Sequence, residues 1–326
     1  TTSGNIAIGI EAGASMTSSG GLNILIGGDA GKSLTSGSEN IAIGSGALDA
    51  STVGDNNIAI GLNTLGSLDT GGGADGDSNI AIGVNAGRSA TVMEGAVLIG
   101  NEAGTSITTG NHNVFIGASA GEATTTGHSN TALGRFALYT NIDGDGSVAI
   151  GFEALQDLEP ADGLTHNTSV GYKAGKSTTT ANHNTLIGSQ AGTVITTGGN
   201  NTALGSAALS ANNVGTDNVA IGKGALEDNV DGSRSVAIGN DSLPNQEPSG
   251  ATNMNNTAVG TESGQDVTTG TTNTLIGTLT GHALTTGSGN TALGYSATFS
   301  SSAAANQTVI GNGAAGHGDN IVTIGN

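Results

Sequence analysis

The chain of 326 residues has no cysteine and no tryptophan, and aromatic residues make up only 2% of it. The absence of cysteine excludes disulfides and thiolate metal sites. The shortage of aromatic side chains argues against an ordinary globular core, which is built from large apolar side chains. No run of about 18 apolar residues occurs, so we expect no transmembrane helix and no membrane insertion.

Basic residues are also scarce, because 7 Lys and Arg stand against 26 Asp and Glu, for a formal net charge of −19. Nucleic-acid binding requires basic patches, so we expect no nucleic-acid partner. The same balance disfavours docking on anionic membranes. A strongly acidic surface instead keeps a protein soluble and resists non-specific association.

Glycine is abundant, with 58 residues, and much of it belongs to a repeat. The motif "NIAIG" returns as "NILIG", "NVFIG", "NTALG" and "SVAIG", and thirteen of the eighteen spacings between its glycines are 17 residues. Repeats of this kind indicate a solenoid. The 19 anchor glycines are Gly9, Gly27, Gly44, Gly61, Gly83, Gly100, Gly117, Gly134, Gly151, Gly171, Gly188, Gly205, Gly222, Gly239, Gly260, Gly277, Gly294, Gly311 and Gly325.

When the anchor glycine is numbered position 5 of each copy, the other positions follow rules. Position 1 is Asn in fourteen copies, position 2 is always β-branched, and position 4 is always Ile, Leu or Val. Position 3 is usually Ala, and position 8 is small. Positions 2 and 4 share one face of a strand and position 3 lies on the other. The pattern therefore predicts one short strand in each copy.

Position 9 alternates between two residue types, Gly as in Gly31 and Leu as in Leu48. The three longest spacings follow Gly61, Gly151 and Gly239 and close groups of copies. A five-coil super-repeat thus overlies the basic period, near residues 79–166 and 167–255. The repeat covers residues 1–326 as one continuous region and leaves no room for a separate globular domain.

The expected fold is an all-β parallel β-solenoid, a β-roll or β-helix of about 19 coils with a 17-residue period. We expect each coil to hold the "NIAIG" strand, a second short strand near positions 8 and 9, and a "TTG" turn. Large apolar side chains stand mainly at positions 4, 2 and sometimes 9, which is a thin core for one chain. Several chains around an axis would also bury the alanines of positions 3 and 8, so a homotrimer is favoured, with a single-chain β-helix as the alternative.

The pattern "NIAIG..AG.S.TTG..N.A.G" resembles the head repeats of YadA-like trimeric autotransporter adhesins. It is equally similar to the "NTALGY.AL" repeats of phage tail fibres and bacterial surface fibres. The adhesin heads have a shorter coil, and only the last spacing, 14 residues, matches theirs. The resemblance implies a trimeric left-handed parallel β-roll, fibre architecture and adhesion.

The stretch "LIGGDAGKSLTS" at residues 25–36 is close to a phosphate-binding loop but fails its spacing. Such a loop has four residues between its glycines, whereas Gly27 and Gly31 have three between them, as do Gly171 and Gly175. These glycines are positions 5 and 9 of the repeat. The following lysine, Lys32, is at the freely varying position 10, so we predict no nucleotide site.

Two acidic turns are candidates for calcium. "TNIDGDGS" places Asn141, Asp143 and Asp145 at the offsets of an EF-hand loop, but that loop's twelfth position is not Glu, and helices are absent. "GGGADGDSN" offers Asp75 and Asp77. The alternative is that these acidic side chains are solvated and bind no metal. Both interpretations also apply to the pair Asp228 and Asp231 in "EDNVDGS". Four histidines precede strands, His112, His128, His166 and His183, and are interpreted as turn residues.

No cysteine, paired-carboxylate or Ser/His/Asp pattern stands outside the repeat, so we expect no enzyme. The sequence favours a structural and adhesive fibre protein, acidic and trimeric, from a phage tail fibre or a cell-surface appendage. It would be extracellular, on a cell surface or a virion, with its own copies and a host or cell-surface receptor as partners. A self-stacking filament subunit and an ice- or calcium-binding β-solenoid are the alternatives. The long turns after Gly61, Gly151 and Gly239 are the candidate receptor contacts.

Overall fold

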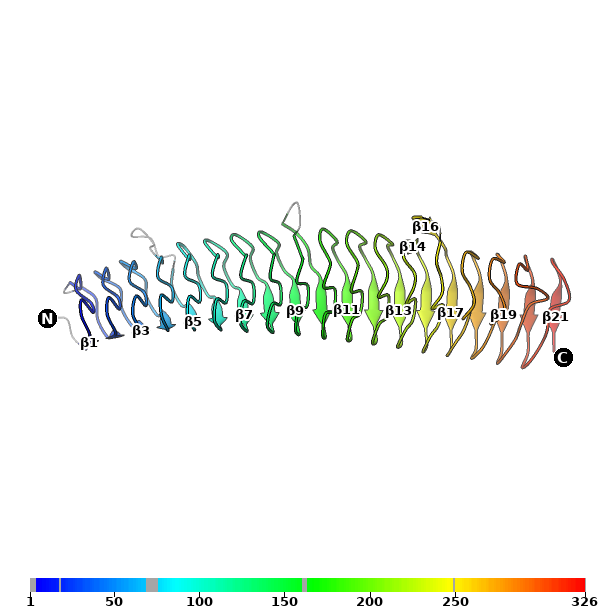
Figure 1. Cartoon of the computed structure of the whole chain (residues 1–326), viewed down its shortest axis with the longest axis horizontal. Coiled ribbons are helices and arrows are strands. Elements are labelled where there is room, and N and C mark those ends of the chain that lie inside the picture. Colours follow the sequence, from blue (N-terminus) through cyan, green and yellow to red (C-terminus); the bar gives the residue numbers. More distant parts are fainter. Residues whose placement is uncertain (1–3, 18, 69–75, 160–162, 249, 326) are drawn as a thin grey trace. The chain divides into compact units, whose positions relative to one another are not determined.

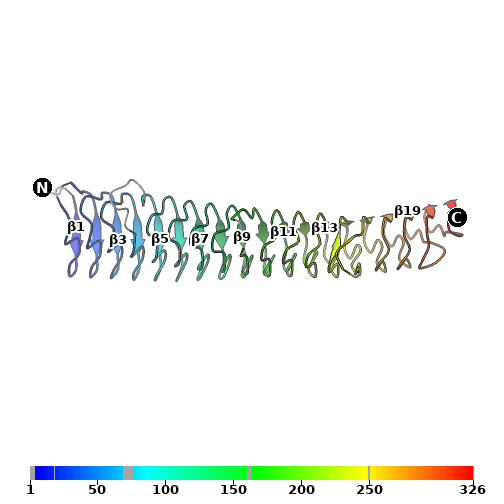
Figure 2. The ribbon, with the colours of Figure 1, turned by 90° about the horizontal axis from the view of Figure 1, so that it is seen from above.

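The computed structural model describes residues 4–17, 19–68, 76–159, 163–248 and 250–325. The chain divides into two compact units, unit 1 at Thr1–His166 and unit 2 at Asn167–Asn326. Within each unit every coil contributes one short strand, and the strands stack side by side (Figures 1 and 2). The described residues form no helix. The predicted all-β parallel solenoid with a period of about 17 residues is confirmed.

Unit 1 is a parallel stack of nine strands, in which each strand pairs in register with the next along the chain. Ile24 of β2, for example, pairs with Ile41 of β3 and Ile43 of β3 with Ile60 of β4. The strands are β1 Ile6–Ile8, β2 Ile24–Ile26, β3 Ile41–Ile43, β4 Ile58–Ile60, β5 Ile80–Ile82, β6 Val97–Ile99, β7 Val114–Ile116, β8 Thr131–Leu133 and β9 Val148–Ile150.

Unit 2 repeats this arrangement and adds a two-residue ladder, in which β14 of one coil pairs with β16 in the long turn of the next coil. Its strands are β10 Thr168–Val170, β11 Thr185–Ile187, β12 Thr202–Leu204, β13 Val219–Ile221, β14 Gly232–Ser233, β15 Val236–Ile238, β16 Thr252–Asn253, β17 Thr257–Val259, β18 Thr274–Ile276, β19 Thr291–Leu293, β20 Thr308–Ile310 and β21 Val322–Ile324.

The anchor glycine ends each strand because no other residue fits there. At Gly117 the backbone has φ +138°, and an added Cβ would lie 2.6 Å from the carbonyl oxygen of Gly134 in the next coil. The same contact recurs at most other anchors within both units, for example between Gly260 and Gly277. A side chain would therefore separate the stacked coils.

The second strand expected near positions 8 and 9 is absent from most described coils, and only a single parallel bridge, Thr298 with Ala315, forms at position 9 near the C-terminal end of unit 2. Positions 7 and 9 both adopt left-handed backbone, as at Asp29 (φ 57°) and Leu48 (φ 55°). Two left-handed residues in a span of three turn the chain too sharply for an extended strand. Leucine in this conformation is strained by about 1 kcal/mol or more, which the surrounding packing offsets.

The core lies on the opposite strand face from the one expected. Position 3 points inward and is fully buried, as at Leu25, Phe115 and Ala203, together with positions 8, 9 and 12. Positions 2 and 4 point outward and are half-buried or exposed. The expectation that the alanines of positions 3 and 8 need a second chain to be buried is therefore wrong. One chain closes around them because the coil interior is narrow.

Positions 3 and 9 compensate each other in volume inside this narrow core. Where position 3 is large, as at Phe115, position 9 is Gly121, whose added Cβ would lie within 2.4 Å of the Phe115 ring. Where position 9 is a leucine, as at Leu138, position 3 is Ala132, and both are fully buried. A large side chain at position 3 and a leucine at position 9 thus occupy the same space inside a coil.

A buried ladder of asparagines closes the coils. The Nδ2 of Asn40 donates to the carbonyl of Gly54 in its own coil (2.7 Å), and its Oδ1 accepts the backbone N–H of Asn57 in the next coil (2.9 Å). In unit 2 the same bonds join Asn201 to Gly215 and to Asn218. Position 1 is Asn because a carboxamide supplies both a donor and an acceptor at one buried site.

Candidate functional site

The outward side chains at positions 2 and 4 form a continuous row along each unit, which we call the strand face. In unit 1 the position-4 side chains include Ile82, 37% exposed, and Leu133, 44% exposed. In unit 2 they include Leu204, Ile276 and Leu293, all more than a third exposed. Because the strands pair in register, apolar side chains stack on apolar side chains at the strand spacing of about 4.8 Å.

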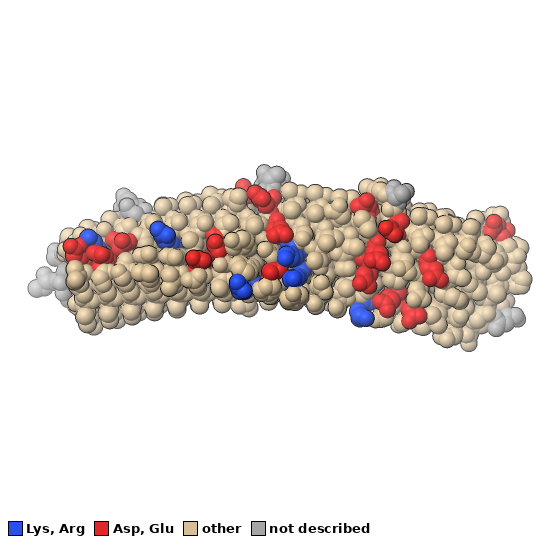
Figure 3. All heavy atoms as spheres, in the orientation of Figure 1, with Lys and Arg blue, Asp and Glu red and all other residues tan. Residues whose placement is uncertain are grey.

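The strand face carries no charge, although the chain has 33 charged residues (7 basic and 26 acidic). Neither position 2 nor position 4 is Asp, Glu, Lys or Arg in any copy. Charged side chains stand instead at positions such as 7 and 10, as at Glu102 and Glu122, and carboxylates prevail on the face seen in Figure 3. A surface from which charge is kept away through 19 copies is the main candidate for an interaction surface.

Position 2 changes in character between the units. It is Ile in the first coils of unit 1, whereas unit 2 has an in-register run of threonines on β17 to β20. That run consists of Thr257, Thr274, Thr291 and Thr308. Each threonine has an apolar position-4 neighbour, so the strand face of unit 2 presents hydroxyl and hydrocarbon rows side by side.

The Gly-Lys-Ser stretch is a turn rather than a phosphate-binding loop. Lys32 forms ion pairs with Glu11 and with Asp29, the latter at 3.3 Å. Hydrogen bonds that the ammonium group donates to Glu11 and Asp29 raise the pKa of Lys32 above its usual range. The lysine is therefore held by acidic neighbours, and the glycines before it are set by coil geometry.

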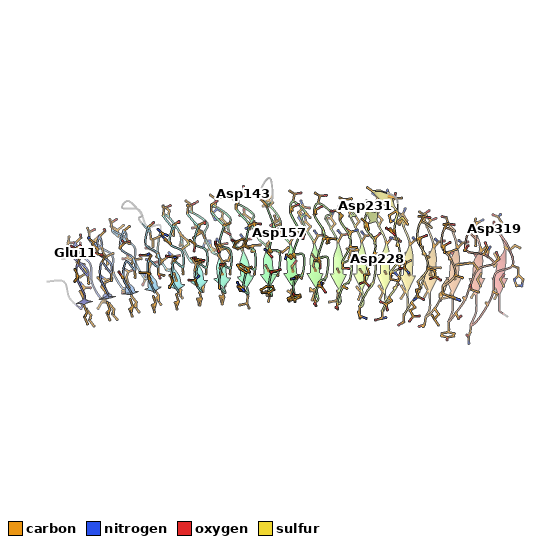
Figure 4. All side chains as sticks on the ribbon, in the orientation of Figure 1. Glu11, Asp143, Asp157, Asp228, Asp231 and Asp319 are labelled. Atoms are coloured by element: carbon orange, nitrogen blue, oxygen red, sulfur yellow. The ribbon has the colours of Figure 1, made fainter. Side chains whose placement is uncertain are left out.

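The turn at Asn141 does not assemble its three candidate calcium ligands around one point. Asn141 is fully buried, and its carboxamide exchanges hydrogen bonds with the backbone N–H and C=O of Gly144, both at 3.0 Å. Asp143 is partly exposed at the outer edge of its coil (Figure 4). Asp145 accepts the backbone N–H of His128 at 2.6 Å.

Asp77 has the same role as Asp145, because its Oδ1 accepts the backbone N–H of Asp55 at 2.7 Å. Asp75 lies outside the described residues. Among the described residues, no group of three or more His, Asp or Glu side chains is placed so that it could hold a metal ion. Calcium binding stays a prediction, which melting in the presence and absence of a chelator would test.

The four histidines lie at exposed turns, as expected of their positions before the strands. His128 belongs to the same ladder as Asp145, since its Nδ1 accepts the backbone N–H of Asn111 at 2.9 Å. Residues at position 16 therefore support the preceding coil, and acid, imidazole and hydroxyl side chains serve equally well. Ser288 does so for Thr271.

Of the three long turns, the one after Gly239 is described most fully. Its Gln246 is fully buried, donates to Asn229 (3.0 Å) and accepts from Asn256 (2.8 Å). This glutamine connects the start of the turn to the asparagine ladder, whereas residues 250–253 farther along the turn are exposed. Residues 69–75 and 160–162 of the other two turns lie outside the described residues.

Two hollows on the coil surface bring charged side chains together. The larger, in unit 2, has a volume of about 390 Å³ and is lined by Asp228, Glu247 and Asp266 with Asn245, Thr268 and Thr285. A smaller hollow in unit 1, of about 210 Å³, is lined by Asp49, Asn63, Gly66, Ser67 and Arg88. Both linings combine carboxylates with neutral hydrogen-bonding side chains, and the smaller one adds a guanidinium.

No protein-family model matches the chain, and a search of curated proteins finds no relative. No helix in the described ranges has the length and hydropathy needed to span a membrane. The strand face, the charge distribution and the hollows are therefore the features of the molecule that bear on its function.

Proposed function

We propose that this protein is a non-enzymatic structural and adhesive fibre segment, assembled from three parallel copies that meet through their strand faces. It would act outside the cell, as part of a phage tail fibre or a cell-surface appendage. Three copies side by side would present the acidic coil surfaces and long turns three times over. Repeated weak contacts of this kind give avidity for a host or cell-surface receptor.

The observation that carries the proposal is the uncharged, apolar strand face on a chain of net charge −19. Burying the exposed half of one Ile or Leu side chain contributes roughly 1 kcal/mol to the free energy of association. A stack of nine or ten coils therefore gains on the order of 10 kcal/mol, comparable with the cost of association of about 4–15 kcal/mol. A closed ring of three hides the strand face of each chain once, so three such gains stand against the cost of two association events.

The assembly is tested by measuring mass in solution. We expect sedimentation equilibrium to give three times the chain mass of 31.3 kDa. The double variant Leu133→Glu with Leu204→Glu should weaken association by at least about tenfold, because it buries unpaired charge. A single-chain mass for the natural sequence at micromolar concentration would refute the trimer.

A matched control places the same charge away from the strand face. Val194 is 40% exposed at position 11, close to the exposure of Leu133 and Leu204. Val194→Glu should leave the mass unchanged. Dissociation caused by Val194→Glu as strongly as by the double variant would mean that added negative charge alone drives it.

A second candidate function follows from the threonine run on β17 to β20. If the chain is a single solenoid, its strand face stays open to water, and the regular hydroxyl and methyl rows are suited to an ordered water lattice such as ice. Thermal hysteresis, measured together with the Thr274→Lys variant, tests this. Activity that is lost in the variant, on a single-chain protein, would favour ice binding over the fibre.

A further inference from the structure

The smaller hollow of unit 1 is built from one repeat position in three successive coils. Asp49, Gly66 and Arg88 all occupy position 10, in the coils of β3, β4 and β5. Their backbones are therefore stacked, and the acidic and basic residues stand two strand spacings apart, about 10 Å. Asn63 and Ser67 of the middle coil complete the lining.

The hollow exists because Gly66 contributes no side chain between the two charges. An added Cβ at Gly66 would meet no atom closer than 3.4 Å, and the Oδ1 of Asp49 would lie 3.5 Å away. The backbone there is outside the left-handed region, unlike that of the anchor glycines. A larger residue would fit without strain and would fill the space.

The two charges face the hollow from opposite ends. Asp49 is half-buried, and its desolvation raises the pKa of the carboxyl above its usual range. Its nearest basic neighbour, Lys32, is already paired with Glu11 and Asp29. Arg88 is exposed at the other end of the lining, and it forms no ion pair with any carboxylate among the described residues.

We propose that this hollow binds a small zwitterion, with its ammonium group at Asp49 and its carboxylate at Arg88. A ligand with only a positive charge would be repelled by Arg88, and one with only a negative charge by Asp49. A zwitterion satisfies both, and the Asn63 carboxamide and Ser67 hydroxyl supply further hydrogen bonds. The volume of about 210 Å³ admits a molecule the size of an amino acid.

The proposal is tested by calorimetry on the full chain with ligands of graded length. We expect 4-aminobutanoate or 6-aminohexanoate to bind at least about tenfold more tightly than glycine, whose charges are too close together to reach both side chains. Butylamine and butanoate, each with one of the two charges, should also bind at least about tenfold more weakly. Equal binding of the singly charged compounds, or no binding by any zwitterion at millimolar concentration, would overturn the proposal.

Three variants locate the site and one serves as a control. Asp49→Asn and Arg88→Gln should each weaken binding by about tenfold or more, and Gly66→Leu should abolish it by filling the hollow. Glu122→Gln removes a charge from position 10 of another coil and should leave binding unchanged. Circular dichroism confirms folding of each variant. A folded Gly66→Leu protein that binds as tightly as the natural sequence would place the ligand elsewhere.

Discussion

At the scale of single residues, buried polar side chains hold adjacent parts of the chain together, as large apolar side chains do in globular proteins. Each asparagine of the ladder satisfies a carbonyl in its own coil and a backbone N–H in the next, so it joins coils as well as closing them. Asn113 bonds the carbonyl of Gly127 at 2.7 Å and the N–H of Asn130 at 2.9 Å. The loss of one side chain leaves two buried backbone groups without partners.

Replacing Asn113 with Ala should therefore lower the free energy of unfolding by about 2–6 kcal/mol, since each of the two orphaned groups costs about 1–3 kcal/mol. Chemical denaturation measures this. Asn101→Ala is the control, because Asn101 is exposed at position 6, and its effect should stay within about 0.5 kcal/mol. Equal effects of the two substitutions would mean that the ladder contributes little.

Asp319 gives a prediction for pH. Its carboxylate accepts the backbone N–H of Ala305 (2.9 Å) and the Nε2 of Gln307 (3.0 Å), and these bonds lower its pKa below the usual 3.8. A lowered folded pKa means that the ionised form stabilises the fold. That contribution is fully present above pH 3.8 and is lost as the pH falls through the lower folded value.

Amide exchange at Ala305 reports this change directly. After correction for the intrinsic rate, its protection should fall once the pH drops below about 3.8, the reference value in the unfolded chain. In the Asp319→Asn variant the carboxamide oxygen still accepts the bond but does not titrate, so protection should be independent of pH. A pH dependence that survives in the variant would assign the effect to another group.

At the scale of the element, the unit of design is the coil with its paired positions 3 and 9. In most coils one of the two side chains is large and the other is small. Where both are small, as at Ala81 and Gly87, leucines of the neighbouring coils reach into the space. Phe115 with Gly121 and Ala132 with Leu138 are the two solutions in neighbouring coils. The order of coil types along the chain can therefore vary without any change in the backbone.

Exchanging the two solutions in one coil tests this. Phe115→Ala alone should cost about 3–5 kcal/mol through the cavity it leaves. Gly121→Leu alone should cost about 1–3 kcal/mol or more by overpacking. The double variant should be more stable than the sum of the single effects predicts, by about 2 kcal/mol or more. Additive effects, measured by urea unfolding, would show that the two positions do not share one space.

At the scale of the whole molecule, charge and apolar surface are kept apart. The acidic residues stand on the coil surfaces away from the strand face, and the strand face has no charged residue at all. Copies that associate through the strand face still repel each other through their net charge of −19. Salt screens that repulsion with a Debye length of about 10 Å at 0.1 M and leaves apolar contacts intact.

Association of the chains should therefore strengthen as NaCl is raised from about 20 mM to 500 mM. An interface based on ion pairs would weaken over the same range. Sedimentation at the two salt concentrations distinguishes them, and Val194→Glu provides a protein with one more negative charge and an unaltered strand face. Its association should depend on salt slightly more steeply than that of the natural sequence.

The sequence was sufficient to predict the coils, their period and the strand that ends at each anchor glycine, and also that the glycines before Lys32 are repeat positions. It did not predict the hollow of Asp49 and Arg88, because these residues are far apart in the sequence. Their shared position 10 indicated that the two residues stack in nearby coils. Alignment of the copies does not show that the missing side chain of Gly66 leaves a space between them. The roles of Asn141 and Asp145 were missed for a similar reason, since their partners are backbone groups.

The sequence by itself determined where each strand lies and that the coils stack in register, because parallel stacking requires equivalent residues at equal intervals. Only the tertiary structure decided which strand face points inward. The alternation of side chains along a strand places position 3 on one face and positions 2 and 4 on the other. It does not say which of the two faces packs into the core. The narrow interior decides it, because it holds few large side chains in each coil, such as a leucine at position 9 opposite Ala or a phenylalanine at position 3 opposite Gly. The β-branched row is left outside.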